Sequence, residues 1–141
     1  MFVRLQKFFD RHMRELMQGH LTEFVSEYDF PMALHLKETL IVYPSPVKML
    51  EATQAYHAWL VADGVSSMHV RINAVDVPRQ ERFRVWTTIF HTRPKGQPTS
   101  QTESVYYLRR KRGRILIEMV DCTETPDVEF LRSRQFHRQI A

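Results

Sequence analysis

The sequence of 141 residues lacks the residues that several kinds of active site require. A single cysteine, Cys122, excludes an internal disulfide and a multi-cysteine metal site, and it suits a reducing compartment. No Gly-x-Ser-x-Gly motif for a nucleophilic serine is present. The glycines are few and lie far apart, so the chain has no glycine-rich loop for phosphate or dinucleotide binding: Gly19, Gly64, Gly96 and Gly113.

Histidines are more frequent, but their spacing does not predict a metal site. None stands in a His-x-x-x-His or His-x-His pair, the arrangements that bring two imidazoles to one ion. Because nucleotide motifs are missing as well, we expect no metal and no other cofactor. The seven histidines are His12, His20, His35, His57, His69, His91 and His137.

Long apolar runs are also missing. No run approaches the roughly 20 residues of a membrane span, and the N-terminus lacks the apolar core of a signal peptide. The N-terminal stretch is basic and amphipathic like a transit peptide, but Asp10 and Glu15 argue against that class. We therefore expect a cytoplasmic protein. Its net charge of +4 and pI of about 9.5 permit an anionic partner without requiring one.

Four strand-like segments between Ser67 and Thr123 organise the chain as an antiparallel meander. Side chains of one kind recur at every second position, which is the period of a strand. Turn signals separate the segments at Val77–Gln80, Arg93–Pro98 and Arg112–Gly113. Both faces of the strands carry apolar or aromatic residues, which predicts that both are covered. Helices can cover one face, and a second copy of the chain is the simplest cover for the other.

The segments before the meander have helical spacing. Apolar residues at every third or fourth position predict an amphipathic helix over residues 2–18 and a shorter helix before the break at 29–31. A short hairpin follows, with strands at 31–36 and 39–43. Residues 45–64 then form a helix with serine as the N-cap, proline at the first helical position and glycine at the end.

This order of elements resembles the nuclear transport factor 2-like superfamily, which includes ketosteroid isomerase and the SnoaL-type polyketide cyclases. The likeness spans roughly Leu5 to Glu124, and Ile115 stands where many members have tryptophan. Three stretches carry it: Asp29-Phe30-Pro31 before the hairpin, the helix Ser45–Gly64, and Val105-Tyr106-Tyr107-Leu108-Arg109-Arg110 followed by a turn and Arg114-Ile115-Leu116-Ile117.

The resemblance implies an α+β fold in which a cone-shaped, curved antiparallel sheet wraps around N-terminal helices and encloses a pocket. It also implies a homodimer through the outer sheet face. Residues 1–125 would form this single domain, and residues 126–141 a basic C-terminal helix or tail packed on the domain or on a dimer partner. Members range from isomerases and dehydratases to non-catalytic binding modules, so the fold alone does not assign an activity.

Polar residues inside apolar elements are candidates for proton transfer. An isomerase, cyclase or dehydratase on this scaffold needs a histidine or carboxylate in an apolar pocket, where burial moves its pKa towards neutrality. The alternation does not say which face of the meander points inward. The alternative for each candidate is an ordinary polar residue with a local hydrogen-bond partner. The catalytic candidates are His35, Tyr56, His91 and Asp121, with Glu118 as a further polar group.

Aromatic residues are candidates for the walls of a pocket that holds a flat organic ligand. The candidate pocket residues are Trp59, Trp86, Tyr106 and Tyr107, together with Glu118. Packing in the core or at a dimer interface is the alternative for the four aromatic residues.

Three functions are compatible with the sequence. We expect binding of a small, largely apolar organic molecule, with general acid–base catalysis as a candidate activity. The alternative is a non-catalytic interaction or dimerisation module whose cone is filled by its own side chains. A weaker alternative is anion or nucleic-acid binding through the basic turn 109–114, although charges at a hairpin turn are usually solvated. We expect neither nucleic acid nor a membrane as a partner.

Overall fold

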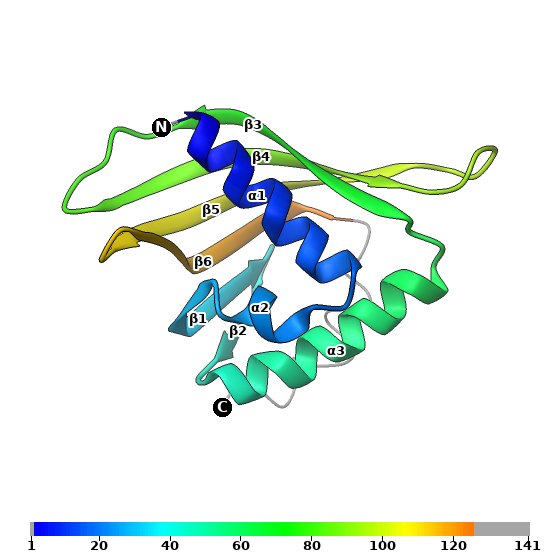
Figure 1. The fold of residues 1–141 in the computed structure, drawn as a ribbon, viewed down its shortest axis with the longest axis horizontal. Helices are drawn as coiled ribbons and strands as arrows, with labels where there is room; N and C mark the ends of the chain where they lie inside the picture. Colours follow the sequence, from blue (N-terminus) through cyan, green and yellow to red (C-terminus); the bar gives the residue numbers. More distant parts are fainter. Residues whose placement is uncertain (1, 126–141) are drawn as a thin grey trace.

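A computed structural model of the protein describes residues 2–125 (Figure 1). The helices and strands follow one another in the predicted order, and the first helix ends one residue earlier than expected. The first strand begins at Tyr28 and so includes residues 29–31, where a break was expected. The tail expected at residues 126–141 lies outside the described residues. The elements are α1 (Phe2–Met17), α2 (Leu21–Val25), β1 (Tyr28–Leu36), β2 (Thr39–Tyr43), α3 (Pro46–Ala62), β3 (Ser67–Val75), β4 (Arg82–Thr92), β5 (Ser100–Lys111) and β6 (Arg114–Glu124).

The strands form one mixed sheet with the order β2-β1-β6-β5-β4-β3. The meander from β3 to β6 is antiparallel, as predicted, and Phe83 of β4 lies opposite Leu108 of β5. The hairpin joins the meander through a parallel ladder between β1 and β6, with His35 opposite Asp121. An antiparallel sheet was expected throughout. Because β2 already occupies one edge of β1, β6 adds to the free edge, where the two strands run in the same direction.

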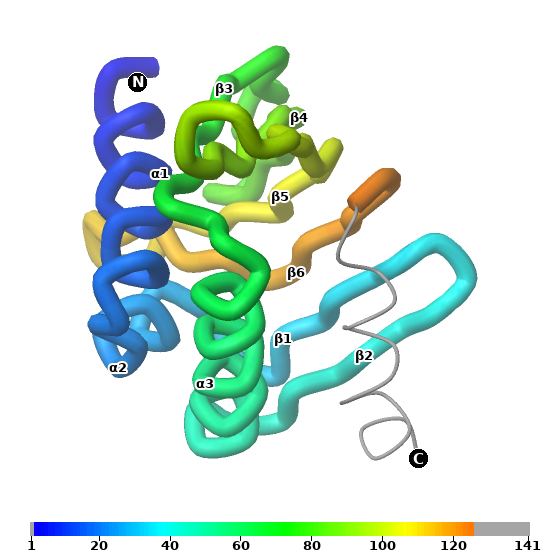
Figure 2. The backbone as a smooth tube through the Cα atoms, turned by 90° about the vertical axis from the view of Figure 1, so that its right-hand side faces the viewer, coloured from blue at the N-terminus to red at the C-terminus, as the bar shows by residue number. Residues whose placement is uncertain are grey.

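Alternation along β4 and β5 identifies the inner face of the sheet. Phe83, Val85 and Ile89 are buried on β4 while Arg84 is exposed, and Tyr106 is buried on β5. Figure 2 shows that the three helices lie together on one side of the curved sheet. The buried strand residues share one core cluster with buried residues of these helices, so they face that side. The predicted α+β arrangement, a curved sheet wrapped around helices, is confirmed.

Helix α1 buries one stripe of side chains under the sheet. Leu5, Phe9, Met13 and Leu16 are all nearly inaccessible, and the helix packs against β3. His12 lies on the same stripe and is also fully buried. A polar ring at such a position needs hydrogen-bond partners inside the protein.

Helix α3 begins and ends as predicted. Ser45 accepts a hydrogen bond from the backbone N–H of Lys48 at 3.4 Å, which is the N-cap contact. Gly64 follows the last turn with φ of +82°, a conformation that favours glycine. No helix within residues 2–125 is long and apolar enough to cross a membrane.

Candidate functional site

A cavity of about 120 Å³ lies between α3, the inner face of the sheet and the C-terminal half of α1. Its walls are mostly apolar. Four methionines from four different elements contribute to them, and methionine side chains are flexible enough to adapt to the shape of a bound group. They are Met13 of α1, Met32 of β1, Met49 of α3 and Met68 of β3.

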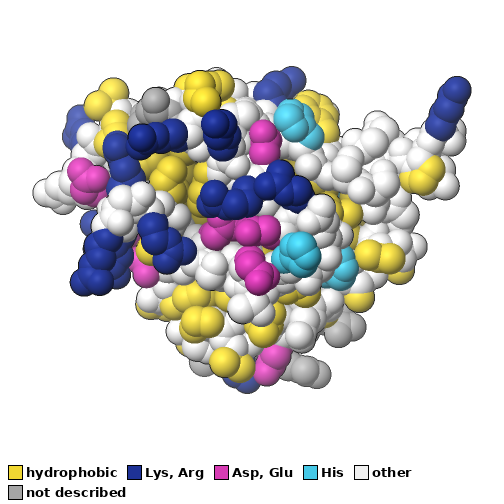
Figure 3. All heavy atoms as spheres, in the orientation of Figure 1, with side chains coloured by type: hydrophobic (Ala, Val, Ile, Leu, Met, Phe, Trp, Pro, Cys, Tyr) yellow, Lys and Arg dark blue, Asp and Glu magenta, His cyan; other side chains and the backbone are white. Residues whose placement is uncertain are grey.

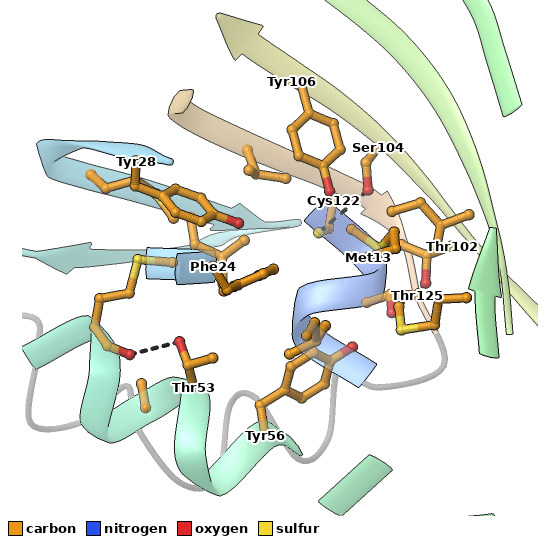
Figure 4. A pocket seen from close by; sticks show the side chains of 18 of the residues that line it. Met13, Phe24, Tyr28, Thr53, Tyr56, Thr102, Ser104, Tyr106, Cys122 and Thr125 are labelled. Carbon is orange, nitrogen blue, oxygen red and sulfur yellow. Dashed lines mark hydrogen bonds between the residues drawn. The ribbon is translucent and has the colours of Figure 1, made fainter. Parts of the chain in front are cut away.

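Hydroxyl groups interrupt the apolar wall, and some of them are bonded within the protein (Figure 4). The hydroxyl of Thr53 donates to the carbonyl oxygen of Met49 at 2.7 Å, and that of Ser104 donates to the Cys122 Sγ at 3.6 Å. These two donors are therefore already used and offer little to a ligand.

Tyr106 has a hydroxyl of a different kind. The residue is 4% exposed and lines the cavity, yet no group among residues 2–125 forms a hydrogen bond with its hydroxyl. Burial raises the pKa of Tyr106 above its usual value, so the group remains a neutral phenol. The hydroxyl oxygen does not belong to the fully buried side-chain atoms that lack a hydrogen-bond partner, so it borders the open space of the cavity. It is therefore available to a polar atom of a bound molecule.

A buried chain of hydrogen bonds reaches the cavity at Tyr28. Glu27 Oε1 lies 2.9 Å from His12 Nδ1, and His12 Nε2 lies 2.9 Å from the hydroxyl of Tyr28, which lines the cavity. The imidazole is stacked on Phe24, with ring centroids 4.0 Å apart, and is also nearly parallel to Phe8, with ring centroids 5.8 Å apart. Burial lowers the pKa of His12 and raises that of Tyr28 well above its usual value, so both groups are neutral.

Two further ionisable groups lie beside Glu27. Arg11 Nη2 donates to Glu27 Oε2 at 2.8 Å, and Glu15 lies close to both Glu27 and His12. Burial opposes ionisation of Glu27, but hydrogen bonds from His12, Glu15 and Arg11 outweigh it and lower the pKa to about 2. Burial, followed by the hydrogen bond to Glu27, raises the pKa of Glu15 to about 7. Glu27 is thus a carboxylate held by donors, and Glu15 is about half protonated at pH 7.

The same cluster offers the donor atoms of a metal site. One ligand atom from each of His12, Glu15 and Glu27 lies within 4.8 Å of the others. Both oxygens of Glu27 are already engaged, one by His12 and one by the Arg11 guanidinium. These two contacts account for the charge of Glu27 without an ion. Glu15 Oε1, by contrast, is buried and has no hydrogen-bond partner among residues 2–125.

Two of the predicted catalytic residues lie at the cavity or directly behind its wall. Tyr56 lines it and stacks on Trp59, with 6.2 Å between ring centroids. His91 is fully buried, and its Nε2 lies 2.8 Å from the hydroxyl of Thr102, which lines the cavity. His91 thus reaches the cavity through Thr102, and Trp59 supports Tyr56 from outside the lining.

The other predicted residues lie on the outer face of the sheet. Asp121 falls between two lining residues of β6 and points away from them; its Oδ1 lies 3.3 Å from Nδ1 of His35. Trp86, Tyr107 and Glu118 do not line the cavity either. The guanidinium of Arg84 lies over the Trp86 ring, 4.8 Å from its centroid, and Glu118 is 3.0 Å from Arg82 Nε. The period of two separates these residues from their inward-facing neighbours.

The sequence interpretation did not identify His12, Glu27 and Tyr28 as a site. The available signal was a histidine on the apolar stripe of an amphipathic helix, followed by adjacent Glu and Tyr at the next helix-to-strand junction. Only the packing of α1 against the start of β1 brings the three together.

No protein-family model and no curated protein matches the chain, but solved structures do. A domain of unknown function with a cystatin-like fold from Nostoc punctiforme has a TM-score of 0.68 at 14% identity and covers 91% of this chain and 80% of its own. An NTF-2-like protein of unknown function from Shewanella oneidensis has a TM-score of 0.61 at 13% identity, and the match covers 80% of this chain and 90% of that protein.

A third similar structure, a protein from Catenulispora acidiphila in complex with S-DNPA, has a TM-score of 0.62 at 15% identity and covers 86% and 92% of the two chains. At such identities the likeness establishes the fold alone. The predicted resemblance is confirmed at that level: the chain has the nuclear transport factor 2-like, or cystatin-like, fold.

Proposed function

We propose that this protein binds a small, largely apolar organic molecule in the cavity between α3 and the sheet. The observation that carries the proposal is a methionine-rich cavity bordered by the Tyr106 hydroxyl, which forms no hydrogen bond with any group among the described residues. A ligand with an apolar body and one polar substituent would match both features.

The size of the cavity sets the size of the ligand. An engineered protein cavity of about 150 Å³ accommodates benzene, so about 120 Å³ suits a molecule built on a single ring. Drug-sized ligands occupy roughly 300–1,000 Å³, and would require the four methionines to move. Among structures of this fold, the Catenulispora acidiphila protein is in complex with S-DNPA, which supports ligand binding as a use of the fold.

The test is an NMR titration with toluene as the probe. We expect toluene to shift the resonances of cavity residues and to bind in the millimolar range, about 4 kcal/mol. Ala52→Leu, on the cavity wall, should abolish these shifts by filling the space, whereas Ala58→Leu on the exposed side of the same helix should leave them unchanged. Absence of cavity shifts in the unchanged protein would refute the proposal.

Acid–base catalysis in the same cavity is a second candidate. It is favoured by the chain from Glu27 through His12 to Tyr28, because these residue types can move a proton to or from a bound molecule. An isomerase, cyclase or dehydratase activity would use such a group. Cyclohexanone in D₂O is a suitable probe: catalysed exchange of its α-hydrogens, lost in Tyr28→Phe, would support catalysis, and an unchanged background rate would exclude proton abstraction from this ketone.

The alternatives from the sequence have less support. The cavity is not filled by its own side chains, which disfavours the filled-cone module. In the basic turn, Arg109 lies 3.2 Å from Asp29 and Arg110 lies 3.8 Å from Glu81, so two of its charges are compensated internally. Basic and acidic side chains also lie side by side on the face seen in Figure 3. A nucleic-acid surface would instead favour uninterrupted positive charge.

A further inference from the structure

We propose that His12 and Glu27 fix the Tyr28 hydroxyl as a hydrogen-bond acceptor towards the cavity, so that the cavity selects ring compounds carrying a hydroxyl donor, such as phenols. This inference rests on the proposed ligand binding and specifies its chemistry. The position of each proton in the hydrogen bonds from Glu27 through His12 to Tyr28 can be assigned in turn, starting at the Glu27 carboxylate.

The first proton is located by Glu27. An ionised carboxylate accepts hydrogen bonds and cannot donate them. Glu27 Oε1 lies 2.9 Å from His12 Nδ1 while Arg11 occupies Oε2, so the contact with His12 requires a proton on Nδ1. In a neutral imidazole the other nitrogen, Nε2, then carries a lone pair and accepts.

The second proton is located by that lone pair. The hydroxyl oxygen of Tyr28 lies 2.9 Å from His12 Nε2. Because Nε2 carries no hydrogen, the hydrogen of this bond comes from the Tyr28 hydroxyl, which therefore donates to His12. A phenol has one hydrogen, and once it is directed at His12 the oxygen has only lone pairs left. Figure 4 shows Tyr28 among the residues around the cavity, on the opposite side from α3.

The surroundings of His12 keep it neutral. The ring is 0% exposed and stacks with the aromatic rings of Phe8 and Phe24, so an additional charge would be poorly solvated. Burial accordingly lowers the pKa of His12. The tautomer with hydrogen on Nδ1 therefore persists in neutral solution.

Tyr28 thus differs from Tyr106 in what it offers a ligand. The Tyr106 hydroxyl, with no partner among residues 2–125, can turn its hydrogen towards or away from the cavity. Tyr28 can only accept. A hydroxyl on the ligand satisfies Tyr28 and can accept from Tyr106, whereas a methyl group in the same place satisfies neither.

The tautomer is tested without any ligand by long-range ¹H–¹⁵N NMR of the imidazole of His12 at neutral pH. We expect a protonated Nδ1 and an unprotonated Nε2. A protonated Nε2 with a bare Nδ1 would mean that Tyr28 directs its hydrogen into the cavity, and would overturn the inference. Because the protein is unchanged, no variant has to fold for this measurement.

Selection is tested by comparing phenol with toluene, which has the same shape and lacks the donor. In Tyr28→Phe, the ratio of the dissociation constant of phenol to that of toluene should be about tenfold higher than in the unchanged protein. It should stay constant in Tyr107→Phe, which removes a hydroxyl from the outer face. An unchanged ratio in Tyr28→Phe would overturn the inference while toluene binding upholds the proposed function. If neither compound binds, the proposed function fails, and selection fails with it.

Discussion

Arg109 Nη1 lies 3.2 Å from Asp29 Oδ2, and this contact ties the end of β5 to the beginning of β1 across β6. Asp29 directly follows Glu27 and Tyr28 in the chain. A second tie is the hydrogen bond from the backbone N–H of Ile117 to the carbonyl oxygen of Glu27, at 2.9 Å. The residues at the start of β1 are therefore held from the sheet as well as by α1.

Replacing Arg109 by Gln should weaken this region modestly. Both side chains of the pair are partly exposed, so we expect a loss of about 0.5–1 kcal/mol in the free energy of unfolding. Urea denaturation measures it. Arg112→Gln, at the exposed tip of the same hairpin, is the control and should have no effect. An equal loss in both variants would show that net charge, not the Asp29 contact, is responsible.

The two carboxyl groups beside His12 predict opposite effects of pH on stability. The pKa of Glu27 falls from 4.5 to about 2 on folding, so its contribution is lost as the pH drops through that range. The pKa of Glu15 rises from 4.5 to about 7, so its contribution is present at low pH and is lost as the pH rises from 4.5 to 7.

Glu15→Gln should remove only the second effect. Relative to the unchanged protein, the variant should gain stability progressively between pH 4.5 and 7, because it has no carboxyl group to ionise beside Glu27. Urea midpoints at several pH values measure the difference in stability between the variant and the unchanged protein. The titration of His12 is common to both proteins and does not contribute to this difference. Glu38→Gln, in the exposed turn between β1 and β2, should give a difference that does not change with pH. A flat difference for Glu15→Gln would contradict the shifted pKa.

Enlarging the cavity should widen the range of ligands. Met49 is 6% exposed and lines the wall, so Met49→Ala should cost about 2–4 kcal/mol of stability and admit naphthalene, a two-ring compound. NMR titration detects the binding. Met119 lies outside the cavity lining, and Met119→Ala should not admit naphthalene. Naphthalene binding to the unchanged protein with equal affinity would show that the methionines already move aside.

The outer sheet face leads us to propose a homodimer. Trp86, Val105, Tyr107 and Met119 remain partly exposed there, and the registers place Trp86 opposite Val105 and Tyr107 opposite Met119. Sedimentation should give twice the chain mass of 16.9 kDa. Val105→Glu should give the single mass by burying a charge in the interface, while Gln54→Glu on α3 should not. A single mass for the unchanged protein would exclude the dimer.

Much of the fold could be predicted because its signals are local. The alternation in β4 and β5, the turns, the Ser45 cap and Gly64 each depend on a few neighbouring residues. The parallel ladder between β1 and β6 could not be predicted in this way, because its partners are far apart in the sequence and no turn connects them.

The site was harder to predict for the same reason. Alternation separates the residues of a strand into two faces but does not say which face is inside, so Tyr107 and Trp86 were as plausible as Tyr106. Register shifts between Tyr107 and Leu108 and between Tyr28 and Ala33 complicate the period further. The hydrogen bonds of His12 are made with Glu27 and Tyr28, which follow α2 in the chain. The fold of the chain between α1 and β1 brings these residues together.

The position of β6 between β1 and β5 has a consequence for how the protein is made. His35 and Asp121, which pair across β1 and β6, are 86 positions apart. A ribosome therefore releases the N-terminal helices and the hairpin long before the strand that completes the sheet. Until then the free edge of β1 is an unpaired template for other chains. Such long-range pairing also slows folding. Because Val120 and Cys122 of β6 line the cavity, the cavity is complete only after β6 has joined the sheet.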